Sequence, residues 1–197
     1  TYQATFTGRN SFSKTDTDAT FMRMKDDHMR NGQLKAGYNL QIATENQFVL
    51  HYDIFPNPTD TKTLLPFLDS YPHETKTIVA DAGYGSEENL LTLDQEEINH
   101  LIKYGRVDKE QKRGYRKSDK NLDNWHYDEK EDSYTHPEGW VYQFDHLKHS
   151  HTTIGFKQEI RDYKAEQPDL APQKGLYVNE RYQVLKRKES QVLLSDE

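Results

Sequence analysis

Asp81 is the side chain of this sequence that is best placed for chemistry. It follows the short apolar run Thr77–Ala80 and precedes the tight turn Ala82–Gly85. A short apolar run bounded by turn residues is typical of a strand buried on both faces. A carboxylate that follows such a strand lies at the sheet edge where α/β proteins bind ligands. Position alone leaves two roles open, because Asp81 either caps the turn or binds a cation.

Alternating residues predict two strands ahead of Asp81. Tyr38, Leu40 and Ile42 alternate with polar or small neighbours, which is the pattern of a strand that buries one apolar face. Gln47–Phe55 is predicted as the second strand, after a turn at Glu45-Asn46. Two strands joined this closely form an antiparallel hairpin.

The strand that ends at Asp81 lies between two predicted helices. Apolar residues recur at helical spacing over 64–68, and Pro66 among them either kinks this helix or sits in its first turn behind a Thr63 cap. Ser86 is predicted to cap the second helix, which runs to about Gln95. Ile98–Tyr104 is predicted as a further strand. Residues 37–104 therefore predict an α/β core with a mixed sheet.

The composition restricts the class of protein and the kind of site. The 197 residues carry a net charge of −7, yet eight Lys or Arg stand against three acids between residues 103 and 120. There is no cysteine, which excludes disulfides and thiolate metal sites. No apolar run reaches the roughly 20 residues that span a bilayer, and no signal peptide is visible. A cytoplasmic protein without a membrane partner is expected.

The chain after residue 105 has a different character. Aromatic residues stand among charged ones and predict a small antiparallel β insertion, followed by a linker over 167–175 and a helix over 178–194. We therefore expect four segments: an N-terminal arm over 1–36 with a short strand at Ala19–Met24, a core over 37–105, a basic segment and β insertion over 106–166, and a linker with the last helix over 167–197.

Four segments between residues 13 and 105 follow one another in the order of a known family. They are Thr15–Met22, Lys35–Ala43, Asn57–Asp60 and Ala80–Asn89. The last resembles the Asp-x-Gly-Tyr segment that ends a central strand in DDE-type transposases of bacterial insertion sequences. The first resembles the Asp-Pro-Asp-Ala element of their eleven-eighty-two group. The chain is thus similar to a central fragment of such a transposase, and its start at Thr1 fits a fragment.

The resemblance implies an RNase H-like fold and a role in DNA transposition. In this family three carboxylates hold two Mg²⁺ or Mn²⁺ ions, which serve phosphodiester cleavage and strand transfer on double-stranded transposon ends and target DNA. Asp81 would be the second of the three acids and a metal ligand. Whether the complete enzyme is a homodimer is left open.

The other two acids of that set have only partial candidates. No Asp-Gly-Thr or Asp-Ser-Thr string precedes Asp81, and the pair Asp16 and Asp18 is interpreted either as containing the first metal-binding acid or as a loop-capping pair. Glu180 and Glu189 are interpreted either as the third acid or as surface carboxylates. The strings that surround the final Glu in this family are absent here.

Basic and histidine-rich segments offer further sites. His146, His149 and His151 are interpreted either as a metal site or, because their spacing is uneven and no Cys accompanies them, as ordinary surface residues. Six basic side chains between residues 103 and 117 are interpreted either as contacts to DNA phosphates or as part of a solvated face. They are Lys103, Arg106, Lys112, Arg113, Arg116 and Lys117.

Two functions remain open from the sequence. The first is a DDE transposase catalytic domain, of which this chain is a fragment that is inactive alone. The alternative is a catalytically inert, truncated remnant that keeps the fold and DNA binding. A nuclease of the same fold without transposition is a third option. The flanking coding sequence would separate the first two, because an upstream Asp-Gly-Thr strand and a downstream Glu helix would complete the enzyme.

Overall fold

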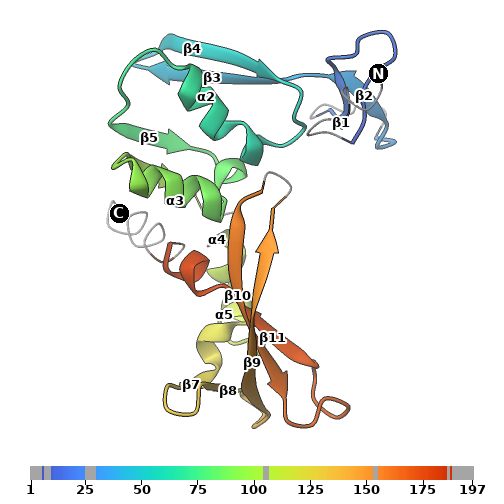
Figure 1. The fold of residues 1–197 in the computed structure, drawn as a ribbon, viewed down its shortest axis with the longest axis vertical. Helices are drawn as coiled ribbons and strands as arrows, with labels where there is room; N and C mark the ends of the chain where they lie inside the picture. The colour runs from blue at the N-terminus through green and yellow to red at the C-terminus, as the bar shows by residue number, and fades with distance from the viewer. Residues whose placement is uncertain are drawn as a thin grey trace. The chain divides into compact units, whose positions relative to one another are not determined.

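The described residues in the first half of the protein form three strand pairs and two α-helices (Figure 1). The computed structural model describes residues 6, 10–24, 30–103, 107–152, 155–185 and 187. The chain divides into a first unit, Thr1–Ile102, and a second unit, Lys103–Glu197. The described elements of the first unit are β1 (Thr20–Arg23), β2 (Leu34–Gly37), β3 (Asn39–Glu45), β4 (Phe48–Phe55), η1 (Asp60–Lys62), α2 (Leu64–Ser70), β5 (Thr77–Ala80), η2 (Ala82–Tyr84), α3 (Glu87–Gln95) and β6 (Asn99–Ile102).

The strands β3 and β4 form the predicted antiparallel hairpin. Its apolar face, which was predicted to be buried, is exposed. Leu40 lies opposite Ile54, and Ile42 lies opposite Tyr52. All four side chains are more than half exposed and together form what we call the apolar hairpin face. Gln41, between them, is only 5% exposed because it belongs to a buried hydrogen-bond network. The prediction that this strand buries its apolar side chains is therefore wrong.

The strands β5 and β6 pair in parallel, with Thr77 opposite Asn99. The helix α3 connects them, as expected because parallel strands need a crossover. These three elements confirm the segments predicted around Asp81, and Pro66 lies in the first turn of α2. The strand β5 is not buried on both faces, however, since Val79 is 75% exposed.

The first unit contains separate two-stranded sheets where a single mixed sheet was predicted. In the described part of the chain β3 pairs only with β4, and β5 pairs only with β6. The remaining pair, β1 with β2, is antiparallel and confirms the short strand predicted within Ala19–Met24. The α/β character is confirmed, but β3 and β5 each keep one edge that no described strand covers.

The second unit is built on a five-stranded antiparallel sheet with the strand order β11-β10-β9-β8-β7 (Figure 1). The predicted antiparallel β structure is thus present, and β9 and β10 are its longest strands. The described elements are α4 (Val107–Glu110), α5 (Arg113–Arg116), η3 (Leu122–Asn124), β7 (His126–Asp128), β8 (Ser133–Thr135), β9 (Val141–His151), β10 (Lys157–Ala165) and β11 (Gly175–Val178).

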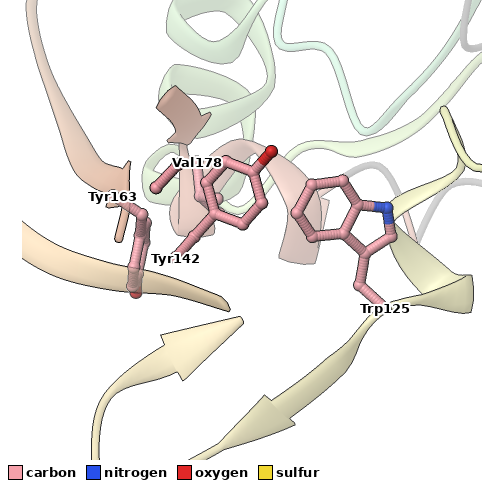
Figure 2. Packing of buried hydrophobic residues seen from close by; sticks show 5 residues of the cluster. Trp125, Tyr142, Tyr163 and Val178 are labelled. Carbon is pink, nitrogen blue, oxygen red and sulfur yellow. The ribbon is translucent and has the colours of Figure 1, made fainter. Parts of the chain in front are cut away.

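An aromatic cluster forms the core of this unit (Figure 2). Trp125, Tyr142, Tyr163 and Val178 are buried there, and the Trp125 and Tyr142 rings lie 5.1 Å apart. The Trp125 indole N–H donates to a backbone carbonyl at 2.7 Å, and the Tyr142 hydroxyl does so at 3.0 Å. Buried Trp and Tyr require such partners for their polar ends.

The strand β11 was not predicted and lies at the junction between the predicted linker over 167–175 and the predicted helix over 178–194. Gly175 pairs with Lys164, and a Cβ on Gly175 would stand 3.1 Å from the carbonyl oxygen of Tyr163. A strand that needs a glycine for this close approach resembles a loop in sequence. The last helix is described over 180–185, so it begins two residues later than predicted. In the described part of the chain no helix is long and apolar enough to cross a membrane.

Candidate functional site

Asp81 caps the turn at the C-terminal end of β5. Its Oδ1 accepts a hydrogen bond from the Ala82 N–H at 2.6 Å, at the start of η2. Its side chain is exposed, and none of the described residues donates a hydrogen bond to Oδ2. The two roles considered for Asp81 are therefore compatible, because a capping carboxylate still has an oxygen to offer to a cation.

A second acid, Asp60, lies beside this turn and was not among the predicted site residues. Its Oδ1 accepts hydrogen bonds from the side-chain amides of Asn39 at 2.8 Å and Gln41 at 3.1 Å. The Tyr84 hydroxyl donates to Oε1 of Gln41, which extends the network to the turn after Asp81. In the sequence Asp60 ends the segment Asn57–Asp60, and no local pattern indicates its hydrogen bonds, because its partners are 21 and 19 positions away.

The environment of Tyr84 reflects both acids. Burial raises the pKa of the Tyr84 hydroxyl, and the carboxylates of Asp60 and Asp81 raise it further. The hydrogen bond with Gln41 lowers this pKa, but the sum is still a raised value. Tyr84 therefore remains a neutral hydrogen-bond donor at neutral pH.

The turn after Asp81 is anchored by two polar side chains. The Asn89 amide donates to the carbonyl of Thr61 at 2.9 Å and to that of Tyr84 at 2.8 Å. The Thr61 hydroxyl donates to the carbonyl of Gly83 at 2.9 Å. The cap predicted at Ser86 is confirmed, since its hydroxyl accepts the N–H of Asn89 at 3.1 Å. These bonds fix the backbone that positions Asp81.

An open groove of about 760 Å³ runs beside Asp81. Residues 41–45 of β3 line it, and so do residues 75–81, which include β5. Each of these two strands keeps one edge without a partner in the described structure. Backbone N–H and C=O groups on such edges are available for pairing with another strand.

The other predicted acids that the structure describes form hydrogen bonds or ion pairs with neighbouring residues. Asp16 accepts hydrogen bonds from the Tyr38 hydroxyl at 2.7 Å and from the N–H of Asp18 at 3.2 Å. Glu180 forms an ion pair with Arg161 at 3.3 Å, and Glu189 lies outside the described residues. As far as the first unit is described, no group of three acids or histidines at metal-ligand spacing contains Asp81. The roles of these acids stay predictions.

Four of the predicted DNA-contacting side chains surround one short helix. α5 carries Arg113 and Arg116, Lys112 and Lys117 flank it, and all four are exposed. The Asn124 amide holds the end of this segment by donating to the carbonyl of Arg116 at 2.8 Å. Of the remaining two candidates, Lys103 is exposed and Arg106 lies outside the described residues.

The three histidines considered as a metal site do not gather in one group. In the described residues the group with metal-ligand spacing contains Asp145, His146 and Asp162. Neither His149 nor His151 belongs to it. The His149 ring instead lies 3.9 Å from a carboxylate oxygen of Glu159 on the neighbouring strand.

Comparison with known families defines the class of protein. A family model of the transposase DDE domain matches residues 10–184, which include the Asp81 turn, the groove and the β sheet of the second unit. Because the match covers most of the chain, the protein belongs to the transposase DDE domain family. No curated protein and no solved structure gives a significant match.

Proposed function

We propose that this chain forms part of the catalytic domain of a DNA transposase and that Asp81 is one of its metal-binding acids. Membership of the family supports DNA transposition as the function. The observation that carries the role of Asp81 is its exposed carboxylate at the end of β5, beside the groove. We extend the proposal to Mg²⁺ or Mn²⁺ as cofactor, double-stranded DNA as substrate and the eleven-eighty-two group as the branch of the family.

The described acids fit one ligand position of such a metal site and not the whole site. Hard divalent cations prefer carboxylate oxygens, and Asp81 has one to offer. Asp60 is close to the turn but only partly exposed, its Oδ1 accepts from two amides and its Oδ2 lies against Gly83, so we assign it to positioning. One acid does not hold two ions, and the remaining ligands have to come from other segments.

An additional strand between β3 and β5 would complete this part of the core. Both strands line the groove with unpaired edges, and Val79 on β5 is 75% exposed although its sequence is typical of a buried strand. The resemblance to DDE transposases implies a first core strand that carries the first acid. Such a strand would bring that acid to Asp81, which supports the proposal that this chain is inactive alone.

The test uses the protein expressed from the complete coding sequence, with a double-stranded transposon end and Mg²⁺. We expect Asp81→Asn to lower the rate of strand cleavage by more than about 100-fold, which is the upper range seen when a group that merely supports a metal ligand is removed. Asp69→Asn, an exposed acid on α2, is the matched control and should leave the rate unchanged. Cleavage at the parental rate by Asp81→Asn would contradict the proposal.

The alternative function is a catalytically inert remnant that binds DNA. The exposed basic residues around α5 favour DNA binding under either proposal. The transposase and the inert remnant differ in one outcome. The protein expressed from the complete coding sequence of a remnant would bind a transposon end but would not cleave it in the presence of Mg²⁺ or Mn²⁺.

The DNA-binding part is tested by replacing Arg113 and Arg116 with Gln. Each phosphate contact contributes about 0.9 to the slope of log Kobs against log salt, so the loss of two contacts should reduce that slope by about 2. The double replacement of Lys14 and Lys35, which are exposed in the first unit, is the charge-matched control. Equal slopes for the two variants would remove α5 from the DNA interface.

A further inference from the structure

A bulge in the long hairpin of β9 and β10 gathers three groups that can bind a metal. Asp162 pairs with His146, and the next residue Tyr163 pairs with Phe144, so Asp145 has no residue opposite it. A bulge of this kind turns the extra side chain and is frequent next to functional sites. Ligand atoms of Asp145, His146 and Asp162 all lie within 4.8 Å of one another.

Asp162 is the residue in this group that indicates a missing ligand. It is only 8% exposed, yet none of the described residues gives its carboxylate a hydrogen bond or an ion pair. This carboxylate attracts the Lys164 ammonium only over a longer distance. Burial removes part of the hydration of a carboxylate, and a close cation offsets that cost. A cation between Asp162 and the other two side chains would remove that cost.

We propose that Asp145, His146 and Asp162 bind one first-row divalent transition-metal ion, for which Zn²⁺ is the probe. One imidazole nitrogen with two carboxylate oxygens is a donor set that suits Zn²⁺, and water would complete the coordination. The ion would join β9 to β10 at the bulge. This site is independent of Asp81 and of the proposed catalytic metal.

Lys164 competes with the ion for this site. Its Nζ lies 2.8 Å from Oδ2 of Asp145, and this contact, together with His146 at 2.6 Å, holds the pKa of the Asp145 carboxyl below its ordinary value. The carboxylate is therefore ionised and ready to bind a metal. The Lys164 side chain is 58% exposed, so its ammonium can turn into water when the ion binds.

The experiment is a calorimetric titration of the full chain, first treated with a chelator, with Zn²⁺ and separately with Mg²⁺. We expect the parent protein to bind one equivalent of Zn²⁺ that Mg²⁺ does not displace. Asp162→Asn and His146→Gln should each weaken Zn²⁺ binding at least about tenfold. His149→Gln on the same strand is the matched control and should bind like the parent.

Lys164→Met keeps the proposal testable even if Asp162→Asn fails to fold. Removing the competing ammonium should strengthen Zn²⁺ binding, and Zn²⁺ should raise the melting temperature of this variant. The proposal is overturned if Zn²⁺ binds neither the parent nor Lys164→Met, or if Asp162→Asn and His146→Gln bind it as tightly as the parent.

Discussion

The absence of a side chain at Gly83 allows the Asp81 turn to lie against a second acid. A Cβ on Gly83 would stand 3.0 Å from Oδ2 of Asp60, which is tighter than most Cβ contacts in proteins and would require Asp60 to shift by a few tenths of an ångström. The Asp60 carboxylate cannot simply move aside, because Asn39 and Gln41 hold its other oxygen. The backbone angles of Gly83 are not in the left-handed region, so the reason for a glycine here is its packing against Asp60 and not its backbone conformation.

We predict that Gly83→Ala lowers the free energy of unfolding of the protein by about 1–3 kcal/mol, the usual cost of forcing extra volume into a packed site. Gly114→Ala is the control, because nothing lies within 4 Å of the added Cβ and the residue is helical. There the change should be neutral or stabilise by up to about 1 kcal/mol. Urea unfolding followed by circular dichroism measures both, and equal values would contradict the packing argument.

Part of the candidate site was predictable residue by residue, and part was not. Asp81 and the Ser86 cap follow from local patterns, a strand followed by a turn and a polar residue ahead of a helix, so the sequence predicted them. The role of Asp60 depends on Asn39 and Gln41, which come close only after the β3–β4 hairpin packs on η1. Contacts over such separations leave no periodic signal in a single sequence.

At the level of elements, α3 holds the turn that carries Asp81. Asn89 on this helix is 2% exposed, and its amide bonds the carbonyls of Thr61 and Tyr84. The helix therefore links η1 to η2 in addition to connecting β5 with β6.

We predict that Asn89→Ala lowers the free energy of unfolding by about 1–3 kcal/mol, because it removes a buried side chain whose amide donates to two carbonyls and leaves that of Thr61 without this donor. Asn124→Ala is a matched control, since the Asn124 amide also bonds two carbonyls but is exposed, and water can replace it. Its loss should be clearly smaller. The comparison is made by urea unfolding, and an equal loss for both variants would contradict the role of burial.

Elements were predicted better than the surfaces they bury. The bounds of β4, β5 and α3 follow from their apolar runs and caps, and the structure confirms them. Which face of β3 points inward was predicted wrongly, because the polar network around Gln41 outweighs the alternation of apolar residues. The strand β11 was missed because its Gly175 serves close packing and not a turn.

At the level of the whole molecule, buried tyrosines connect stability to alkaline pH. Burial raises the pKa of Tyr84, Tyr134, Tyr142 and Tyr163 above the ordinary value of about 10, most strongly for Tyr163. The unfolded chain then releases these protons at lower pH than the folded chain does. The contribution of these tyrosines to the free energy of unfolding is fully present below about pH 10. It decreases as the pH rises toward their pKa values in the folded state.

We predict that the free energy of unfolding, measured with urea, declines between about pH 9 and about pH 11. Tyr163→Phe should make this decline shallower, although it also removes the hydrogen bonds between the Tyr163 hydroxyl and its partners Asp132 and Arg161. Tyr177→Phe, at a site that is 63% exposed, should leave the decline unchanged. A decline that is identical in the Tyr163→Phe variant would contradict the assignment.

The mixed sheet expected from the sequence is the largest difference at this level. The pattern of β3 to β6 predicts α/β structure correctly, but pairing between β3 and β5 is not found in the described residues. Strand periodicity indicates which residues form strands and not which strands become neighbours. The groove between these edges is the physical result.

The apolar hairpin face also has a consequence for how the protein behaves in solution. Exposed apolar strands with free edges favour edge-to-edge association between molecules. The net charge of −7 opposes this by repulsion between copies. Salt screens that repulsion over about 10 Å at 0.1 M. High salt, which releases bound nucleic acid from a basic surface, would therefore favour precipitation of this chain, and its colloidal stability should be greatest at low ionic strength.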